Sequence, residues 1–366
     1  MIIGVDAREL EGKPTGVGVY LREILRRVRL PSGAQLQLFF RNAVPGGLGD
    51  VPGAPVVLPS RGTNLAWQQW RLCREASRRG VDLLFSPANS LPWRFRGIQA
   101  MTVMDISFFR YPRWFSTRER LSRQFNTRLS LRQADRIYTI SDYVKQEIVD
   151  RFRIPASRIL TTPCGVSPVQ ADNAGRERLR KAHGISDDKI VLYVGSIFNR
   201  RRLPVLFEAM KHLDASCRLV VIGENRTHPR LDLAVEAQRH GVAGRVQLLE
   251  YAPDETVKEY YRMADVLVYL SEYEGFGIPP LEAMAHGTPA VISPTPAMNT
   301  IYEGSAAVAH EMSAGAVAEA IRRILTDSEE RNRLIRAGLD LAGRYNWEET
   351  ARIVSRDWEQ ILAARR

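Results

Sequence analysis

One stretch of the chain, residues 266–292, constrains the fold more than any other. An apolar run, Val266–Leu270, predicts a buried strand, and a glycine-bearing loop and a helix opened by two prolines follow it. Gly287 stands where a helix ends, and Pro289–Ile292 predicts the next strand. A strand, a helix and a second strand in this order indicate a parallel sheet, and such sheets bind ligands beyond the carboxyl ends of their strands.

Two carboxylates and two glycines lie at this predicted ligand-binding edge. Glu274 is in the loop, and Glu282 follows eight residues later in the first turns of the helix. Gly275 and Gly277 permit positive φ and a close approach of the backbone to a ligand. The backbone amides that we expect to face an anion are those of Phe276, Gly277 and Ile278. The alternative is that the carboxylates are solvated and the glycines only turn the chain.

The full string SEYEGFGIPPLEAMAHGTPAVIS, residues 271–293, resembles the E-x7-E region of retaining glycosyltransferases of family 4. The signature of that family is E-G-F-G-x-P-x-L-E-A-M-A-x-G-x-P-V, and the resemblance points to its mannosyltransferase-like group. It implies the α/β GT-B architecture, two doubly wound Rossmann-like domains facing a central cleft. It also implies that Glu282 holds the ribose hydroxyls of a nucleotide sugar, with Glu274 beside the donor sugar.

The length of 366 residues favours two domains, because single cores seldom grow this large. We place the boundary in a Gly- and Pro-containing segment, giving an N-terminal domain 1–168 and a C-terminal nucleotide-sugar-binding domain 169–346. The resemblance implies that a last helix, 347–366, packs back on the first domain. The remaining expected strands are 2–7, 37–40, 55–58, 82–86, 100–105 and 136–141 in the first domain, and 190–195, 218–223 and 245–250 in the second.

Three consecutive arginines form a second motif, within VGSIFNRRRLPVLFEAM at residues 194–210. They follow a predicted strand and precede a helix, where guanidinium groups suit diphosphate oxygens. A solvated run of charge is the alternative. The segment resembles the family motif G-x-x-x-x-R-K-N-L, which implies that Arg200 and Arg201 bind the donor diphosphate. Arg201 stands in the place of Lys, and Arg202 in the place of Asn.

Two weaker motifs extend the predicted donor site. The loop of residues 13–20, KPTGVGVY, resembles the first glycine-rich loop of the family, which implies that Gly16 and Gly18 approach the phosphates and sugar of the donor. A helix is expected from Val19 to Arg29. Tyr251 follows a predicted strand where the family packs the nucleotide base, so we include it in the donor-binding set.

The segment from Met101 to Ser116 departs from the family at one position. Related chains often read H-D-L-S-F there, and this chain has Met104 in the place of the histidine. A thioether neither transfers protons nor accepts a strong hydrogen bond. Asp105 is retained, and we include it with Glu274 and Arg200 as a catalytic candidate on the acceptor side. The alternative is that Asp105 caps the following turn.

The charge of the chain is uneven. Residues 1–170 hold 26 Lys and Arg against 13 Asp and Glu, a net charge of +13, and the remainder carries −2. We interpret this asymmetry as a site for an anionic membrane surface, with a phosphorylated acceptor as the alternative, and expect no nucleic acid because no recognition motif supports it. The helix expected over 116–134 has an apolar stripe beginning at Leu121 and Phe125 among its arginines. It either lies at a membrane interface or covers the sheet with its arginines solvated.

The resemblance, taken with these features, implies a retaining hexosyltransferase that moves a sugar, GDP-mannose being the favoured donor, to a glycan or lipid-linked glycan in O-antigen or polysaccharide assembly. No Asp-x-Asp occurs, so we expect no metal and no cofactor. Scattered cysteines and the lack of a signal peptide or an apolar spanning segment favour a cytoplasmic protein, peripheral at the inner face of the membrane. The alternatives are a nucleotide-sugar-binding module without transfer activity, or another GT-B enzyme such as a sugar-nucleotide epimerase.

Overall fold

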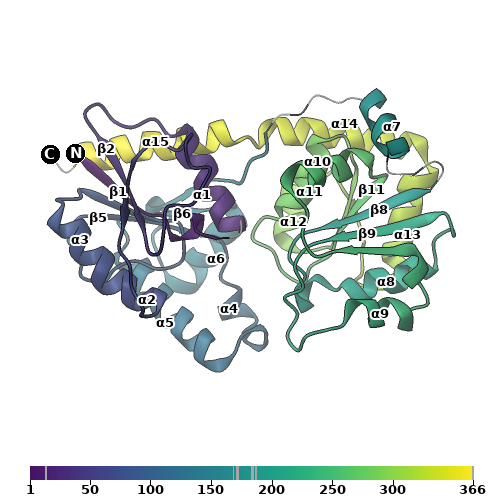
Figure 1. The fold of residues 1–366 in the computed structure, drawn as a ribbon, viewed down its shortest axis with the longest axis horizontal. Helices are drawn as coiled ribbons and strands as arrows, with labels where there is room; N and C mark the ends of the chain where they lie inside the picture. The colour runs from purple at the N-terminus through teal and green to yellow at the C-terminus, as the bar shows by residue number, and fades with distance from the viewer. Residues whose placement is uncertain (13–14, 168, 170–172, 183–184, 186–187, 365–366) are drawn as a thin grey trace. The chain divides into compact units, whose positions relative to one another are not determined.

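The computed structural model describes residues 1–366 except 13–14, 168, 170–172, 183–184, 186–187 and 365–366. The chain forms two compact units (Figure 1). Unit 1 comprises Met1–Cys164 and Trp347–Arg366, and unit 2 comprises Gly165–Asn346. The boundary predicted from the sequence falls at Pro168, which lies outside the described residues.

Unit 1 is built on a parallel sheet of seven strands in the order β3-β2-β1-β4-β5-β6-β7. Its central strands are short runs of buried apolar residues, as expected for a parallel sheet covered on both faces. The strands are β1 (Ile2–Asp6), β2 (Gln35–Phe40), β3 (Ala54–Val57), β4 (Leu83–Ser86), β5 (Ile98–Val103), β6 (Arg136–Thr139) and β7 (Ile159–Thr161). The helices are η1 (Arg8–Leu10), α1 (Gly16–Arg27), α2 (Asn64–Ala66), η2 (Trp67–Leu72), α3 (Cys73–Arg78), α4 (Ser107–Arg110), η3 (Pro112–Trp114), α5 (Thr117–Gln133), α6 (Asp142–Phe152), η4 (Ala156–Arg158) and α15 (Trp347–Ala363).

Unit 2 repeats this plan with six parallel strands in the order β10-β9-β8-β11-β12-β13. The strands are β8 (Lys189–Val194), β9 (Cys217–Ile222), β10 (Val246–Leu249), β11 (Val266–Tyr269), β12 (Ala290–Ile292) and β13 (Ala307–Val308). The helices are α7 (Asn173–Ala182), η5 (Asn199–Arg201), α8 (Leu203–Lys211), α9 (Leu233–Arg239), η6 (Ala243–Arg245), α10 (Asp254–Met263), α11 (Ile278–Ala285), α12 (Pro296–Ile301), α13 (Ala314–Thr326) and α14 (Ser328–Arg344). All the strands expected in this unit are present. Strand β13 was not expected, because a run of two residues is too short to give a recognisable strand pattern.

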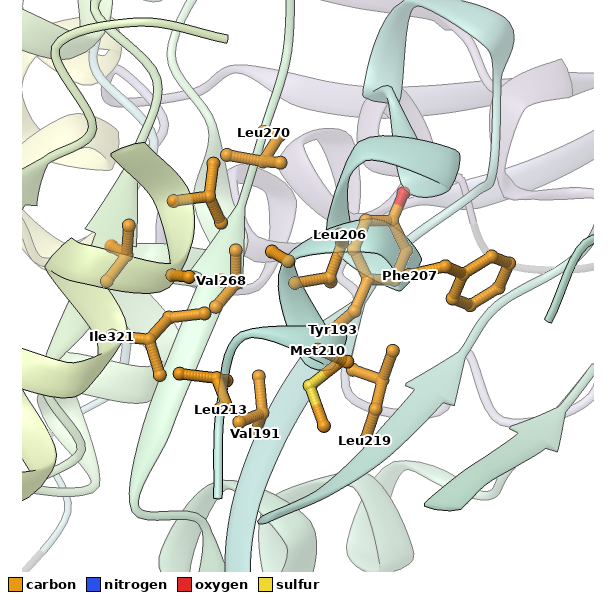
Figure 2. Packing of buried hydrophobic residues seen from close by; sticks show 14 of the residues in the cluster. Val191, Tyr193, Leu206, Phe207, Met210, Leu213, Leu219, Val268, Leu270 and Ile321 are labelled. Carbon is orange, nitrogen blue, oxygen red and sulfur yellow. The ribbon is translucent and has the colours of Figure 1, made fainter. Parts of the chain in front are cut away.

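The core of unit 2 fixes the strands that carry the candidate site. Buried side chains of α8, α13, β8, β9 and β11 form one cluster, which includes Tyr193, Phe207 and Ile321 (Figure 2). These three side chains are almost fully buried. Because interiors packed this closely yield little, the loops that leave β8 and β11 start from fixed positions.

The last helix, α15, belongs to unit 1, where it packs against α1. At its start, Trp347 meets the ring of Tyr20 edge-on at a centroid distance of 6.2 Å. Further along, the buried Asp357 pairs with Arg136 over 2.8 Å and accepts a hydrogen bond from the Tyr138 hydroxyl over 2.7 Å. No helix among the described residues combines the length and the apolar composition needed to cross a bilayer.

Candidate active site

The carboxyl ends of β8 and β11 bring two loops of unit 2 together. Helix η5, which carries Arg200 and Arg201, follows β8, and the loop containing Glu274 follows β11. The backbone N–H of Glu272 donates to the carbonyl of Arg200 over 3.0 Å, which joins the loops directly. The two motifs that the sequence places at neighbouring strand ends are therefore in contact.

Arg201 and Glu274 form a nearly buried ion pair. An Arg201 nitrogen lies 2.7 Å from Glu274 Oε1, and each side chain is only 10% exposed. The Ser271 hydroxyl donates to the same carboxylate oxygen over 2.7 Å, and the guanidinium carbon lies 4.3 Å from the centre of the Tyr269 ring. Burial disfavours the charge on Arg201, but the Glu274 carboxylate together with Tyr269 and Tyr193 outweighs burial, so the pKa of Arg201 is raised. The two side chains therefore hold each other in one geometry.

The other two arginines of the run have different surroundings. The Arg200 guanidinium lies 4.5 Å from the centre of the Phe198 ring and is partly exposed. Arg202 is exposed, adopts a left-handed backbone with φ of 52°, and pairs with Glu272 over 2.7 Å. Taken together, the three arginines of the run and the carboxylates of Glu272 and Glu274 give this cluster a net positive charge. Such a surplus at the end of a strand suits a diphosphate.

Gly277 shapes the loop that leads into α11. Its φ is 85°, and a Cβ built there would stand 2.8 Å from the Met298 sulfur and 3.1 Å from the Tyr269 ring. The buried Tyr302 hydroxyl donates to the Gly277 carbonyl. The preceding Phe276 is buried and meets Tyr345 edge-on at 5.4 Å. The segment Gly275–Gly277 and the first helical residue, Ile278, are thus held by close contacts that only glycine at 277 permits.

Glu282 lies one turn into α11 and is half-buried. The Tyr261 hydroxyl donates to its Oε2 over 2.7 Å, and burial raises the pKa of Glu282 in spite of this hydrogen bond. His286, at the end of the helix, lies with Nδ1 2.8 Å from the Glu282 carbonyl, and burial lowers its pKa. His286 therefore packs as a neutral ring against Tyr261.

A pocket of about 500 Å³ opens beyond the ends of β9 and β10. At its wall Gly223 approaches Gly195 so closely that a Cβ at Gly223 would stand 2.0 Å from the Gly195 carbonyl oxygen. Glu250 lines the pocket, whereas the predicted Tyr251 follows it with 67% of its surface exposed. The sequence placed a base-binding position beside this pocket, at Tyr251, but did not identify the lining, for which the glycines that end β8 and β9 were a usable signal.

The predicted glycine-rich loop of unit 1 differs from expectation. Helix α1 begins at Gly16 rather than at Val19, because the Thr15 hydroxyl accepts a hydrogen bond from the Gly18 N–H over 3.0 Å and caps the helix. Gly16 and Gly18 therefore lie in the first helical turn and not in a loop. A Cβ on Gly18 would stand 2.4 Å from the Glu9 carbonyl oxygen, so this glycine allows α1 to pack on η1. Residues 13–14 of the predicted loop lie outside the described part of the chain.

Asp105 follows β5 in unit 1 and has a capping role. Its Oδ1 accepts hydrogen bonds from the Ser107 N–H over 2.9 Å and from the Ser107 hydroxyl over 2.7 Å. The neighbouring Met104 is partly exposed. These bonds correspond to the alternative that the sequence left open, and a role for Asp105 beside an acceptor remains a prediction.

Unit 1 also holds a charged cluster that the sequence motifs missed. At the end of β1 the buried Asp6 binds Arg8 through two hydrogen bonds of 2.8 and 2.6 Å and accepts a third, from Gln68, over 3.1 Å. Among the described residues no three His, Cys, Asp or Glu side chains converge as a metal-binding group.

Comparison with known proteins relates each unit to a family. A model of glycosyltransferase family 4 matches residues 14–170, and a model of glycosyl transferases group 1 matches residues 175–340. The sequence is 26% identical to O-antigen chain mannosyltransferase B of Escherichia coli over 91% of this chain and 93% of that protein. It is also 26% identical to the GDP-mannose:cellobiosyl-diphosphopolyprenol alpha-mannosyltransferase of Komagataeibacter xylinus, over 58% of this chain but only 54% of that protein.

The fold is also similar to that of a solved structure. Sucrose-phosphate synthase from Thermosynechococcus elongatus superimposes with a TM-score of 0.80 over the whole of both chains, at 21% sequence identity. Two parallel Rossmann-like sheets and this neighbour give the chain the GT-B architecture that the sequence predicted. With one family model on each unit, the chain belongs to the GT-B glycosyltransferases that combine a family 4 N-terminal domain with a group 1 C-terminal domain.

Proposed function

We propose that this glycosyltransferase is a retaining, metal-independent hexosyltransferase. It would take a hexose from a nucleotide sugar and pass it to a glycan or lipid-linked glycan during the assembly of a cell-surface polysaccharide. The observation that carries this proposal is the buried Arg201–Glu274 pair beside Arg200, at the carboxyl edge of the unit 2 sheet. The names of the two mannosyltransferase relatives support mannose as the sugar and GDP-mannose as the donor.

The arginines would bind the donor diphosphate. The guanidinium group of Arg201 has five N–H donors, so it can keep its bond to Glu274 and still donate to a phosphate oxygen. Arg200 would supply a second guanidinium contact to the diphosphate. As the glycosidic bond breaks, negative charge grows on the departing phosphate, so both contacts would strengthen in the transition state and speed the reaction.

The remaining unit 2 residues would position the rest of the donor. Glu282 would accept hydrogen bonds from the ribose hydroxyls, and the amides of the Gly275–Ile278 segment would face the sugar or its phosphate. Glu274, held by Arg201 and Ser271, would stand beside the sugar and stabilise its positive charge in the transition state. The motifs supply no separate nucleophile, so retention would follow a front-face route in which the departing phosphate assists the acceptor.

A panel of nucleotide sugars tests this function directly. The intact protein would be incubated with UDP-, GDP-, dTDP- and ADP-hexoses and with a lipid-linked glycan. Release of the nucleoside diphosphate and the anomeric configuration of the product would be measured. We expect turnover of one donor class with retention, and full activity in excess EDTA. An inverted product would refute the retaining route, and a loss in EDTA that Mg²⁺ or Mn²⁺ restores would refute metal independence.

One observation favours a second candidate, a nucleotide-sugar-binding module without transfer activity. After the carboxyl end of β5 in unit 1, where related chains often carry a histidine, this chain has the Met104 thioether. The Asp105 carboxylate there accepts hydrogen bonds from Ser107. Donor binding without turnover across the acceptor panel would establish that candidate instead.

A further inference from the structure

Helix α5 of unit 1 has an unusual distribution of polar and apolar residues. Its two large apolar residues at one helical spacing, Leu121 and Phe125, are 55% and 60% exposed. The side chains that it buries are mostly polar: Asn126, Thr127, Ser130 and Leu131. A helix that served only to cover the sheet would bury the apolar pair and expose the polar side chains.

The buried polar side chains explain which way the helix faces. The Thr127 hydroxyl donates to the Asn89 carbonyl over 3.0 Å, and the Ser130 hydroxyl accepts from the Leu91 N–H over 2.9 Å. These bonds fasten α5 to the segment that follows β4. Because polar contacts occupy the inward face of α5, Leu121 and Phe125 remain exposed. Packing in the core therefore does not explain why these two residues are large and apolar.

The exposed face of α5 is strongly basic. The helix carries five arginines and a single acidic residue, Glu119, which pairs with Arg123 over 2.7 Å. The arginines on the exposed face are Arg118, Arg123, Arg128 and Arg132. The same face therefore combines apolar side chains that can enter a lipid interface with cations that anionic headgroups attract.

Helix η2, which contacts the segment beside α5, carries a further exposed aromatic residue. Phe125 meets Trp93 edge-on at 5.8 Å, and the backbone N–H of Trp93 donates to Gln69 Oε1 in η2 over 2.8 Å. The next residue along the chain, Trp70, is 67% exposed, and the exposed Arg71 follows it. Tryptophan is enriched where one end of a side chain is apolar and the other is wet, as at a membrane surface.

We propose that the exposed face of α5, formed by Leu121, Phe125 and their flanking arginines and extended by Trp70, docks unit 1 onto an anionic lipid bilayer. Charge complementarity selects this occupant. The face belongs to a part of the chain with a net charge of +13, so it matches negatively charged headgroups and would repel a second copy of itself. The apolar side chains and the arginines supply the two signals that stable peripheral binding requires.

Docking through this face would serve acceptor delivery. Helices α4 and α5, which follow β5 along the chain, lie at the lower margin of unit 1 in Figure 1, so a lipid-linked acceptor bound at the carboxyl end of β5 would lie close to this face. The inference goes beyond the proposed function, because it concerns where the protein lies and holds for any donor.

Vesicle co-sedimentation of the intact protein tests the proposal. Wild type, Leu121→Ser/Phe125→Ser and the control Val44→Ser/Val235→Ser would be mixed with phosphatidylcholine vesicles, with and without phosphatidylglycerol. The control removes two apolar residues of comparable exposure that lie elsewhere. We expect wild type and control to bind only the anionic vesicles, less strongly as salt rises. The α5 variant should partition roughly tenfold to a hundredfold less, which corresponds to about 1.4–2.7 kcal/mol, because its two serines no longer bury apolar surface in the lipid interface.

The outcomes separate this proposal from the proposed function. Circular dichroism should show both variants folded, and their turnover of a soluble acceptor analogue should match wild type. Absence of wild-type binding to anionic vesicles at low salt would overturn the docking surface, as would equal binding by the α5 variant. A wild-type dimer that the α5 variant loses in sedimentation, without vesicle binding, would assign the face to self-association instead.

Discussion

The carboxyl edges of the two sheets are built from the same parallel topology but differ in how their charges are used. In unit 2 three arginines lie with only two carboxylates, Glu272 and Glu274, so the cluster has a net positive charge beside a loop shaped by Gly277. In unit 1 the carboxylates already have local partners, Asp6 in Arg8 and Asp105 in Ser107. The unit 2 edge can therefore attract an anion, whereas the carboxylates at the unit 1 edge are bound by neighbouring residues of the same unit. This difference supports the proposal that the donor diphosphate binds at the unit 2 edge.

Replacing Arg201 should have the largest effect on this comparison. Arg201→Ala removes a diphosphate contact and leaves Glu274 buried without its cation, which typically costs about 3–5 kcal/mol. We expect kcat/KM to fall by a hundredfold or more, at about 1.4 kcal/mol per decade, with a lower unfolding midpoint.

The adjacent Arg202 supplies the matched control. It is exposed and its ion pair with Glu272 is half-solvated, so Arg202→Ala should change stability by less than about 1 kcal/mol and leave activity within roughly threefold. If both variants had similar kinetics, the distinction between a site arginine and a solvated charge run would be wrong.

Gly277→Ala should produce the next largest effect. The new Cβ would meet Met298 at 2.8 Å in addition to the strain of a positive φ. We expect a loss of about 2–4 kcal/mol of unfolding free energy, from backbone strain and overpacking together, and about a tenfold lower kcat/KM. Gly287→Ala separates the two causes, because its φ is 77° and nothing lies within 4 Å of the added Cβ. Equal destabilisation of the two variants in denaturant titrations would mean that Met298 yields and that the loop is not held as described.

The pH dependence of donor affinity should show a smaller effect. Burial raises the pKa of Glu282 above 4.5, so its neutral form stabilises the fold, and this contribution is lost as pH rises through the folded-state pKa. Ribose hydroxyls donate to the ionised form, so affinity for a nucleotide sugar should weaken below that pKa by up to about tenfold per pH unit. Calorimetric titrations should show this dependence in wild type and its loss in Glu282→Gln. An unchanged profile in the variant would assign the ribose contact to another group.

The smallest effect is expected in unit 1. In Asp105→Asn the side-chain carbonyl still accepts the Ser107 N–H, so the cap survives and kcat/KM should stay within roughly threefold of wild type. A hundredfold or greater loss of kcat/KM with unchanged thermal stability would show that the Asp105 carboxylate acts in catalysis and does not only cap the turn at Ser107.

The sequence predicted the fold because, in most of the chain, the spacing of apolar residues and the motifs indicate the same helices and strands. Apolar runs bounded by glycine or charge mark the strands, and the string around Glu274 and Glu282 places both carboxylates at one sheet edge. The Arg201–Glu274 pairing could not be predicted, since it depends on how two loops distant in sequence meet. The orientation of α5 was also hidden. The apolar periodicity of Leu121 and Phe125 does not reveal that Thr127 and Ser130 hold the helix by its polar face.

Calorimetric titration of nucleoside diphosphates tests the central claim, that the donor diphosphate binds at the unit 2 edge, most directly. Wild type would first be titrated with GDP, UDP, dTDP and ADP, and the tightest ligand would then be titrated into Arg200→Ala and Asp105→Asn. Loss of charge-assisted hydrogen bonds worth about 2–3 kcal/mol predicts a Kd roughly 30- to 150-fold higher in Arg200→Ala. The Kd of Asp105→Asn should be unchanged. Unchanged binding by Arg200→Ala with binding lost in Asp105→Asn would contradict the account.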